Sequence, residues 1–250
     1  RNVSQIGIAP FSACTQLTEI NVDEANPYFS SLDGVLTDKN RTTIVAYPAG
    51  KGKRYIIPDG ITKIGTHSFF ACPITYIHTP NSVKTIELFA FASCTDLDTI
   101  ILGNSVDSIE GAAFRINDRL KTIYSMNPIP PAAHPEAFSS FSPMFFIQCT
   151  LYVPVGSLQA YKNAEVWKNF KNIVENDFTG IERPSPDKAK IFGNKNSISF
   201  RNIEPGTDIS IYDTTGKCIK TFAVDGDSEI PLPSGIYLIK YAGRTVKIIL

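Results

Sequence analysis

One arrangement of apolar residues recurs along the first part of the chain. Between Val83 and Leu102 it reads V-x-x-I-x-x-x-x-F-x-x-C-x-x-L-x-x-I-x-L. The copies are filled by Val83, Ile86, Phe91, Cys94, Leu97, Ile100 and Leu102; by Val106, Ile109, Phe114, Asn117, Leu120 and Ile123; by Ile61, Ile64, Phe69, Cys72, Ile74 and Ile77; and by Val3, Ile6, Phe11, Cys14, Leu17, Ile20 and Val22. A unit of this size cannot bury its own apolar residues, so we expect successive units to stack and share a core.

The end of each copy predicts a short β-strand. In L-x-x-I-x-L the Ile and the Leu point inward, and the residue between them points outward. Cys72 and Cys94 are 22 positions apart, and Cys94 and Asn117 are 23 positions apart. This period is typical of a leucine-rich-repeat coil. The pattern therefore predicts a mainly β fold, a leucine-rich-repeat solenoid whose strands pair in parallel.

The repeat is interrupted between Val22 and Tyr55. Asp33-Gly34 and Lys39-Asn40 predict turns, and Val35-Leu36 and Ile44-Val45 predict two paired strands. We therefore expect a hairpin insert at about residues 23–54, after which Tyr55 resumes the stack.

The end of the solenoid has a different composition. Residues 126–143 are rich in proline and small side chains and predict an irregular loop on the last coil. Residues 151–154 predict a final strand. A short helix capped by Ser157, followed by a turn with Trp167 and Phe170, predicts a C-terminal cap at about residues 155–175. The alternative for Trp167 is an aromatic ligand site.

The remaining sequence predicts a second domain. Residues 1–177 form the repeat domain, and residues 178–187, FTGIERPSPD, have the composition of a linker. Residues 188–250 predict a small antiparallel β-sandwich with turns at 213–216 and 242–243. Its expected strands are residues 198–200, 208–212, 217–224, 236–241 and 245–250.

The Cys or Asn position of the repeat allows two interpretations. A small, weakly polar side chain can face inward at a turn, where Asn117 would satisfy backbone groups. Alternatively, Cys72 and Cys94 on adjacent coils could form a disulfide or contribute to a metal site. The chain has five cysteines, without a CxxC pair or a zinc-ligand spacing.

Charge and hydropathy exclude some classes of function. Lys plus Arg equals Asp plus Glu at 24 each, so the chain has no basic excess to attract nucleic acid or an anionic membrane. No apolar run is long enough for a membrane span, and the first residues lack the order of a signal peptide. Because Arg1 lies inside a repeat, we expect upstream sequence that includes a signal peptide.

The outward side chains of the predicted strands form a candidate ligand face. Together with Glu19, this face comprises Asn21, Ile56, Tyr76, His78, Thr99, Ile101, Thr122, Tyr124 and Tyr152. The set is more aromatic and apolar than solubility requires, and tyrosine is favoured at interfaces. The alternative is that these residues only pack side by side along the sheet.

The sequence offers little support for an enzyme. His67, His78 and His134 occupy different repeat positions, and none lies near a GxSxG, an HExxH or a glycine-rich phosphate loop. We predict no catalytic residues, no cofactor and no metal ligands.

Several segments carry a resemblance to known families. IPDGITKIGTHSFFACPITYIHTP, the DGVL hairpin and LYVPVGSLQAYKNAEVWKNF resemble the BspA-like leucine-rich-repeat proteins of Bacteroidetes-type bacteria, over about residues 1–175. ISIYDTTGKCIKT and LPSGIYLIKY are similar to the C-terminal sorting domain of type IX secretion substrates, although KIFGNKNSISF lacks the usual Asn-Pro. The resemblance implies a secreted or outer-surface protein, an adhesin that binds matrix proteins such as fibronectin, and contact between the C-terminal domain and secretion machinery.

Three functions remain open at this stage. The first is an adhesin-like scaffold that binds a protein or glycan on a host or neighbouring cell through the strand face. The second is a structural or export module in which the repeats are a spacer and the sandwich is the working part. The third is a glycan-processing enzyme, which needs a cleft with two acidic groups at working separation.

Overall fold

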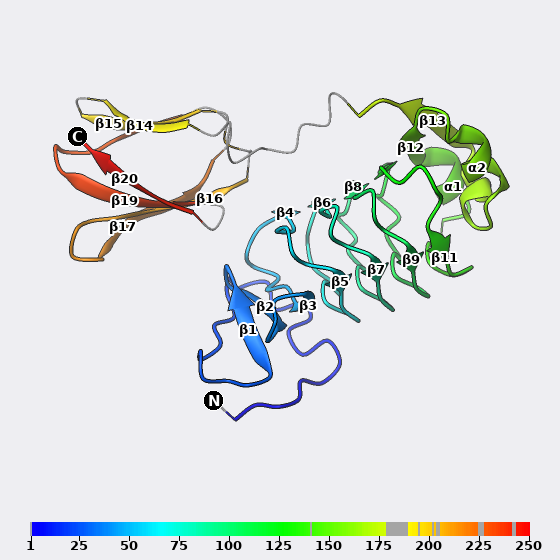
Figure 1. Cartoon of the computed structure of the whole chain (residues 1–250), viewed down its shortest axis with the longest axis horizontal. Coiled ribbons are helices and arrows are strands. Elements are labelled where there is room, and N and C mark those ends of the chain that lie inside the picture. The colour runs from blue at the N-terminus through cyan, green and yellow to red at the C-terminus, as the bar shows by residue number, and fades with distance from the viewer. Residues whose placement is uncertain are drawn as a thin grey trace. The chain divides into compact units, whose positions relative to one another are not determined.

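The chain folds into two compact units, Arg1–Phe178 and Thr179–Leu250. The computed structural model describes residues 2–140, 142–178, 190–194, 196–201, 203, 206–224, 228–241 and 244–250 (Figure 1). Each unit has a hydrophobic core of its own.

The first unit is a solenoid with two walls. One wall is a parallel six-stranded sheet with the order β13-β12-β10-β8-β6-β4. Its strands are β4 (Arg54–Ile56), β6 (Tyr76–His78), β8 (Thr99–Leu102), β10 (Thr122–Ser125), β12 (Thr150–Pro154) and β13 (Asn172–Asn176). The predicted solenoid with parallel strands is confirmed.

The other wall is a seven-stranded sheet with the order β1-β2-β3-β5-β7-β9-β11. Its strands are β1 (Phe29–Leu32), β2 (Val35–Asp38), β3 (Thr43–Ala46), β5 (Lys63–Ile64), β7 (Thr85–Ile86), β9 (Ser108–Ile109) and β11 (Ala132–Ala133). From β3 onward they pair in parallel, and Figure 1 shows β5, β7 and β9 as one row and β4, β6 and β8 as another. Each coil therefore contributes one strand to each wall.

The repeated apolar residues fill the space between the walls. All seven skeleton residues from Val83 to Leu102 are fully buried. At their centre, Phe91 stacks on Phe69 and Phe114, with ring centroids 4.8 and 5.3 Å apart. Tyr47 extends this stack beyond Phe69 at 4.9 Å, and Phe138 extends it beyond Phe114 at 5.1 Å. We call these five rings the core stack.

Four copies of the repeat contain two residues in the left-handed conformation, one two positions before the phenylalanine of the repeat and one two positions after it. These pairs are Ala9 and Ala13, His67 and Ala71, Phe89 and Ser93, and Ala112 and Ile116. The conformation costs a non-glycine residue roughly 1–2 kcal/mol. Hydrogen bonds between neighbouring coils offset this cost, as when the amides of His67 and Ala71 donate to the carbonyls of Leu88 and Ala92.

The N-terminal copy of the repeat differs from the prediction. Its local turn forms, because Ala9 and Ala13 have the left-handed conformation of the other copies. Residues 2–28 contain no strand, however, and Cys14 is exposed. The amide of Ile20 donates to the carbonyl of Gly34 in the insert, so this segment does not pair with β4.

The two strands predicted for the insert pair with each other, and the insert contains one further strand. β2 pairs antiparallel with β3, as the sequence indicates, and also with β1. Asp33 and Gly34 turn between β1 and β2, both with positive φ. β3 belongs to the solenoid wall, because Ile44 pairs in register with Ile64. The insert therefore ends inside the sheet and does not stand apart from the coil.

The prediction of an irregular loop over residues 126–143 is wrong in its centre. Ala132 and Ala133 form β11 and pair with β9, and Phe138 occupies its place in the core stack. These residues make another coil, in which the small side chain of Ala133 pairs with Ile109.

A cap closes the stack, as predicted, with more elements than expected. It contains α1 (Phe145–Gln148), α2 (Leu158–Asn163) and the 3-10 helix η1 (Trp167–Asn169), followed by β13. Trp167 is fully buried against Phe138 and donates its Nε1–H to the carbonyl of Pro131 at 2.7 Å. The aromatic-ligand alternative for Trp167 is therefore wrong. β13 follows the predicted turn and extends the parallel sheet, a strand that the sequence analysis did not predict.

The second unit consists of two antiparallel sheets, as predicted. One has the order β14-β15-β18 and the other β17-β16-β19-β20. The strands are β14 (Lys190–Asn194), β15 (Ser197–Arg201), β16 (Asp208–Tyr212), β17 (Cys218–Ala223), β18 (Ser228–Pro231), β19 (Ile236–Tyr241) and β20 (Arg244–Ile249). β14 and β18 were not predicted. The predicted linker after Phe178 and the turn at 242–243 lie outside the described residues.

The core stack gives a first testable prediction. Phe91→Ala removes a ring shared by three coils and should lower the free energy of unfolding by about 3–5 kcal/mol. Denaturant unfolding followed by the fluorescence of Trp167, the single tryptophan, measures this change. Tyr28→Ala, at an exposed position, should change it by less than about 0.5 kcal/mol. A loss below about 1 kcal/mol for Phe91→Ala would contradict the shared core.

Candidate binding face on the six-stranded sheet

The strand register aligns most of the predicted ligand face. Ile56, His78, Ile101, Tyr124 and Tyr152 pair in succession across β4, β6, β8, β10 and β12. We call this the outer row. β13 adds Val174 beside Tyr152, a residue that the sequence analysis did not include.

A second row runs alongside the outer row. Tyr76, Thr99 and Thr122 pair in succession, as their spacing indicates. The row also includes Arg54, Thr150 and Asn172, which were not predicted. Arg54 lies one coil before Tyr76 and places its guanidinium 3.9 Å from the centroid of the Tyr76 ring, a cation–π contact.

Two of the predicted face residues lie elsewhere. Glu19 and Asn21 are exposed, but they belong to the N-terminal segment that pairs with the insert and not with β4. The expectation that they extend the ligand face is therefore wrong.

The outer row is not uniformly exposed. His78 and Ile101 are almost fully buried, with 1% and 3% of their surface exposed, so neither offers an open contact surface. Strands in a sheet lie about 4.8 Å apart, and side chains in one row therefore contact and cover one another. Ile56 at one end and Tyr124 and Tyr152 toward the other are half-buried.

The accessible aromatic end of the row is well defined. The rings of Tyr124 and Tyr152 stack with centroids 4.8 Å apart and planes 17° apart. Phe178 meets Tyr124 edge-on at 6.5 Å, and Val174 beside Tyr152 is 44% exposed. We call these four residues the tyrosine platform.

The chemistry of the platform follows from this geometry. Burial raises the pKa of the Tyr124 hydroxyl, and the neighbouring Tyr152 raises it further, so the phenol stays protonated at neutral pH. A protonated phenol both donates and accepts a hydrogen bond. Because the two rings cover each other's faces, the contact surface consists of ring edges, hydroxyls and the side chain of Val174.

The Cys or Asn position has a structural role. The Cys94 thiol lies 3.0 Å from the carbonyl oxygen of Phe69, and Asn117 Nδ2 donates to the carbonyl of Phe91 at 2.9 Å. The Cys72 thiol makes the same contact with the carbonyl of Tyr47. Cys72 and Cys94 are free thiols, so the disulfide alternative is wrong. Each inward side chain therefore binds the core-stack residue of the preceding coil.

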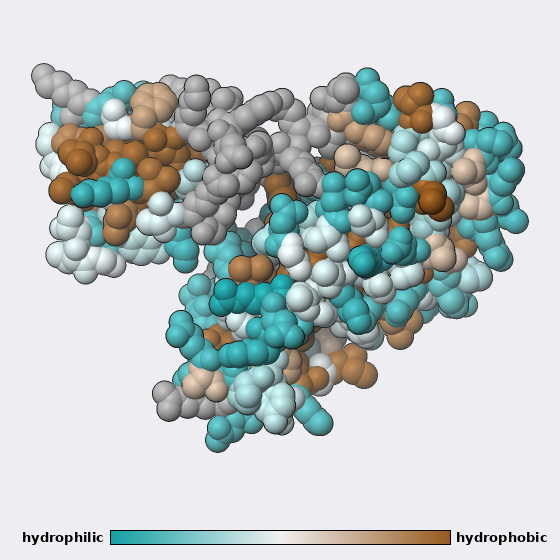
Figure 2. All heavy atoms as spheres, in the orientation of Figure 1, coloured by the Kyte–Doolittle hydropathy of each residue, from teal (hydrophilic) through white to brown (hydrophobic). Residues whose placement is uncertain are grey.

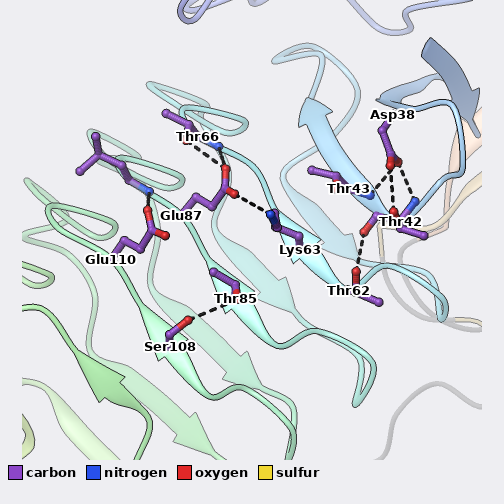
Figure 3. A network of polar contacts seen from close by, with 11 residues as sticks. Asp38, Thr42, Thr43, Thr62, Lys63, Thr66, Thr85, Glu87, Ser108 and Glu110 are labelled. Atoms are coloured by element: carbon purple, nitrogen blue, oxygen red, sulfur yellow. Dashed lines mark hydrogen bonds and ion pairs between the residues drawn. The ribbon is translucent and has the colours of Figure 1, made fainter. Parts of the chain in front are cut away.

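The other wall carries a polar network that the sequence analysis missed. Figure 3 shows Glu87 and Glu110 at equivalent positions of neighbouring coils. Glu87 accepts hydrogen bonds from the amide and hydroxyl of Thr66 and pairs with Lys63 at 3.1 Å. Glu110 accepts from the amide of Leu88 at 3.0 Å. The signal in the sequence was the recurrence of Glu at one repeat position.

The histidines do not come together. His67 is half-buried between Phe70 and Phe89 and not exposed as a turn residue would be; its burial lowers its pKa. His78 is buried in the outer row, and His134 is exposed on the other wall. Within the described ranges, no group of three or more His, Cys, Asp or Glu is arranged to hold a metal ion.

Comparison with known families agrees with the repeat architecture. A sequence profile described as the BspA type leucine rich repeat region matches residues 48–151 in six copies. The repeats of the solenoid are therefore similar to that repeat region over these residues. A search of curated proteins gave no match.

Three of the solved structures to which the chain is similar come from bacteria. The pneumococcal vaccine antigen PcpA is 18% identical with a TM-score of 0.42, covering 64% of this chain and 50% of that protein. A leucine-rich cell surface protein from Faecalibacterium prausnitzii is 20% identical with a TM-score of 0.40, covering 70% and 46%. A leucine-rich-repeat protein from Bacteroides capillosus is 25% identical with a TM-score of 0.35, covering 54% and 98%. The chain spans about half the length of the first two proteins.

The described part of the chain contains no helix with the length and apolar character needed to cross a bilayer.

The buried thiols give a second prediction. Burial raises the pKa of Cys72 and Cys149 to about 12, and that of Cys94 well above its ordinary value. Thiolates, not thiols, react with iodoacetamide, so at pH 8 the native protein should be alkylated only at Cys14 and Cys218. Mass spectrometry of native and denatured samples measures this difference, and rapid labelling of Cys94 in the native protein would contradict the buried position.

Proposed function

We propose that this chain is an adhesin-like binding scaffold, secreted or displayed on the outer cell surface, which engages a protein or glycan partner through the strand face of the solenoid. The observation that carries the proposal is the tyrosine platform, with its two stacked, half-buried tyrosines and the exposed Val174. Tyrosine is enriched at interfaces because it combines apolar area with a polar tip and loses little conformational entropy.

The geometry favours a protein over a glycan as the partner. A sugar ring packs on the exposed face of an aromatic ring, and in the platform the two tyrosines stack face to face. The edges, hydroxyls and Val174 suit the irregular surface of a folded protein or an extended peptide. The parallel strands present this surface in a fixed order, as repeat proteins do for macromolecular partners.

The glycan-processing alternative finds less support. A glycoside hydrolase holds one carboxyl group protonated in a protected site. Among the described residues, Glu110 and Glu136 share a groove, but both are open to water and Glu110 already accepts a hydrogen bond from Leu88. The groove does not supply the required burial.

Binding to an array of matrix glycoproteins and glycans tests the proposed face. Tyr124→Ala combined with Tyr152→Ala should weaken binding by more than about tenfold, because tyrosines at the centre of an interface contribute most of its energy. Tyr28→Ala combined with Tyr212→Ala removes the same groups elsewhere and should leave affinity unchanged. Equal affinity of the two double variants would contradict the proposal, provided that both have native circular dichroism.

One observation also favours the export alternative. β19 alternates exposed and buried residues, and its outward Ile236 and Leu238 lie with Ile249 of β20 on one side of the four-stranded sheet. Ile249 is 68% exposed, and Figure 2 shows hydrophobic residues gathered over β19 and β20. An apolar sheet face of this kind is suited to contact other proteins, such as secretion machinery.

Deletion of residues 188–250 tests this alternative in cells that export the protein. If the sandwich is an export module, the shortened chain should remain inside the cell and still fold, because the solenoid has its own core. Immunoblots of cell and culture fractions measure its location, and a full chain with Ile219→Ser serves as a point-mutant control. Normal export of the shortened chain would contradict the export function.

A further inference from the structure

A shallow groove lies on the seven-stranded wall of the solenoid. It has a volume of about 580 Å³ and is formed by turns after β7, β9 and β11. Its lining residues include Leu88, Phe89, Ala112 and Ala133 on the apolar side and Glu110, His134 and Glu136 on the polar side. The groove is separate from the tyrosine platform, because the two lie on different sheets of the solenoid.

The floor of the groove is apolar and held in place. Leu88 is 40% exposed, and Phe89 is half-buried with φ of 55° in the left-handed conformation. The Phe89 ring stacks on His67 at 4.9 Å, which fixes its direction. A Cβ atom at Gly111 would come within 3.3 Å of His134 and 3.4 Å of Leu88, so glycine allows these side chains their present positions.

The rim of the groove carries carboxylates. Glu110 and Glu136 are both exposed, and the amide of Glu136 donates to Nδ1 of His134. Oε2 of Glu110 accepts the Leu88 amide, which leaves Oε1 directed away from that bond. In the part of the chain that the structure describes, no Lys or Arg forms an ion pair with Glu110.

The preceding coil shows which group pairs with a glutamate at the position of Glu110. Glu87 is the equivalent of Glu110, and Lys63 pairs with its Oε1 at 3.1 Å. The strand register places Thr85 one coil after Lys63, so the coil before Glu110 has a hydroxyl where the coil before Glu87 has an ammonium. Figure 3 shows the two carboxylates, with Lys63 beside Glu87 and Thr85 in the next strand.

We propose that this groove binds a lysine-containing segment of a protein partner, whose ammonium group pairs with Glu110 and Glu136 and whose aliphatic stem lies on Leu88 and Phe89. A lysine side chain has both features, an apolar stem and a charged end, that the groove matches. The partner supplies to Glu110 the cation that Lys63 supplies to Glu87. The net charge of the chain is zero, so general attraction of basic peptides is weak.

The probe for this proposal is a short fluorescein-labelled peptide in which lysine alternates with glycine, compared with the same peptide carrying glutamate. Fluorescence anisotropy with the full chain measures affinity. The lysine peptide should bind saturably and the glutamate peptide should not. Absence of saturable binding of the lysine peptide would overturn the proposal.

Matched variants locate the binding. Glu110→Gln removes the charge and keeps an oxygen to accept the Leu88 amide, so it should weaken binding of the lysine peptide about fivefold. Glu165→Gln makes the same change on the exposed surface of the cap and should have no effect. Leu88→Ser should also weaken binding, because the stem loses its apolar contact. Equal affinity of Glu110→Gln and Glu165→Gln would overturn the assignment to this groove.

Discussion

The core stack of Tyr47, Phe69, Phe91, Phe114 and Phe138 fixes the distance between one coil and the next. Its rings lie 4.8 to 5.3 Å apart, close to the spacing of strands in a sheet. The stack and the two walls therefore advance by the same step, and neither has to bend to follow the other. The inward thiols and the amide of the repeat bind the backbone of these same aromatic residues, which joins the stack to its turns.

A common step for both walls also explains the two candidate surfaces. On one wall, alternation along the strands places Tyr124 beside Tyr152. The sequence predicts this alignment, because the spacing between copies is regular. It does not predict that His78 and Ile101 are buried, since exposure depends on the size of neighbours in adjacent strands. The groove on the other wall was missed because its lining residues come from several coils. The position of Glu110 depends on its hydrogen bond to Leu88 in the neighbouring coil.

The fold was predictable where the apolar period is complete. Phe91 and the residues around it lie where the spacing indicates, and the tail divides into antiparallel strands at its alternating runs. The coil ending at Phe138 was missed because Ala133 and the surrounding prolines hide the period, although a small residue still pairs with Ile109. The N-terminal copy shows the reverse: Cys14 matches the pattern but stays exposed, because the backbone near Ile20 bonds to the insert.

The cap has a consequence for how this architecture can change in evolution. Trp167 and its bond to the carbonyl of Pro131 close the stack at one fixed place, where the Trp167 ring contacts Phe138 of the core stack. Duplication of one 22- or 23-residue unit between Ile61 and Leu120 would add one ring to the interior, one residue to the outer row and one residue to the second row. Both surfaces would become about 4.8 Å longer along the stack per duplicated unit, while the residues of the cap stayed the same. The number of repeat units is thus the property of the solenoid that can change with the least disturbance to the rest of the structure.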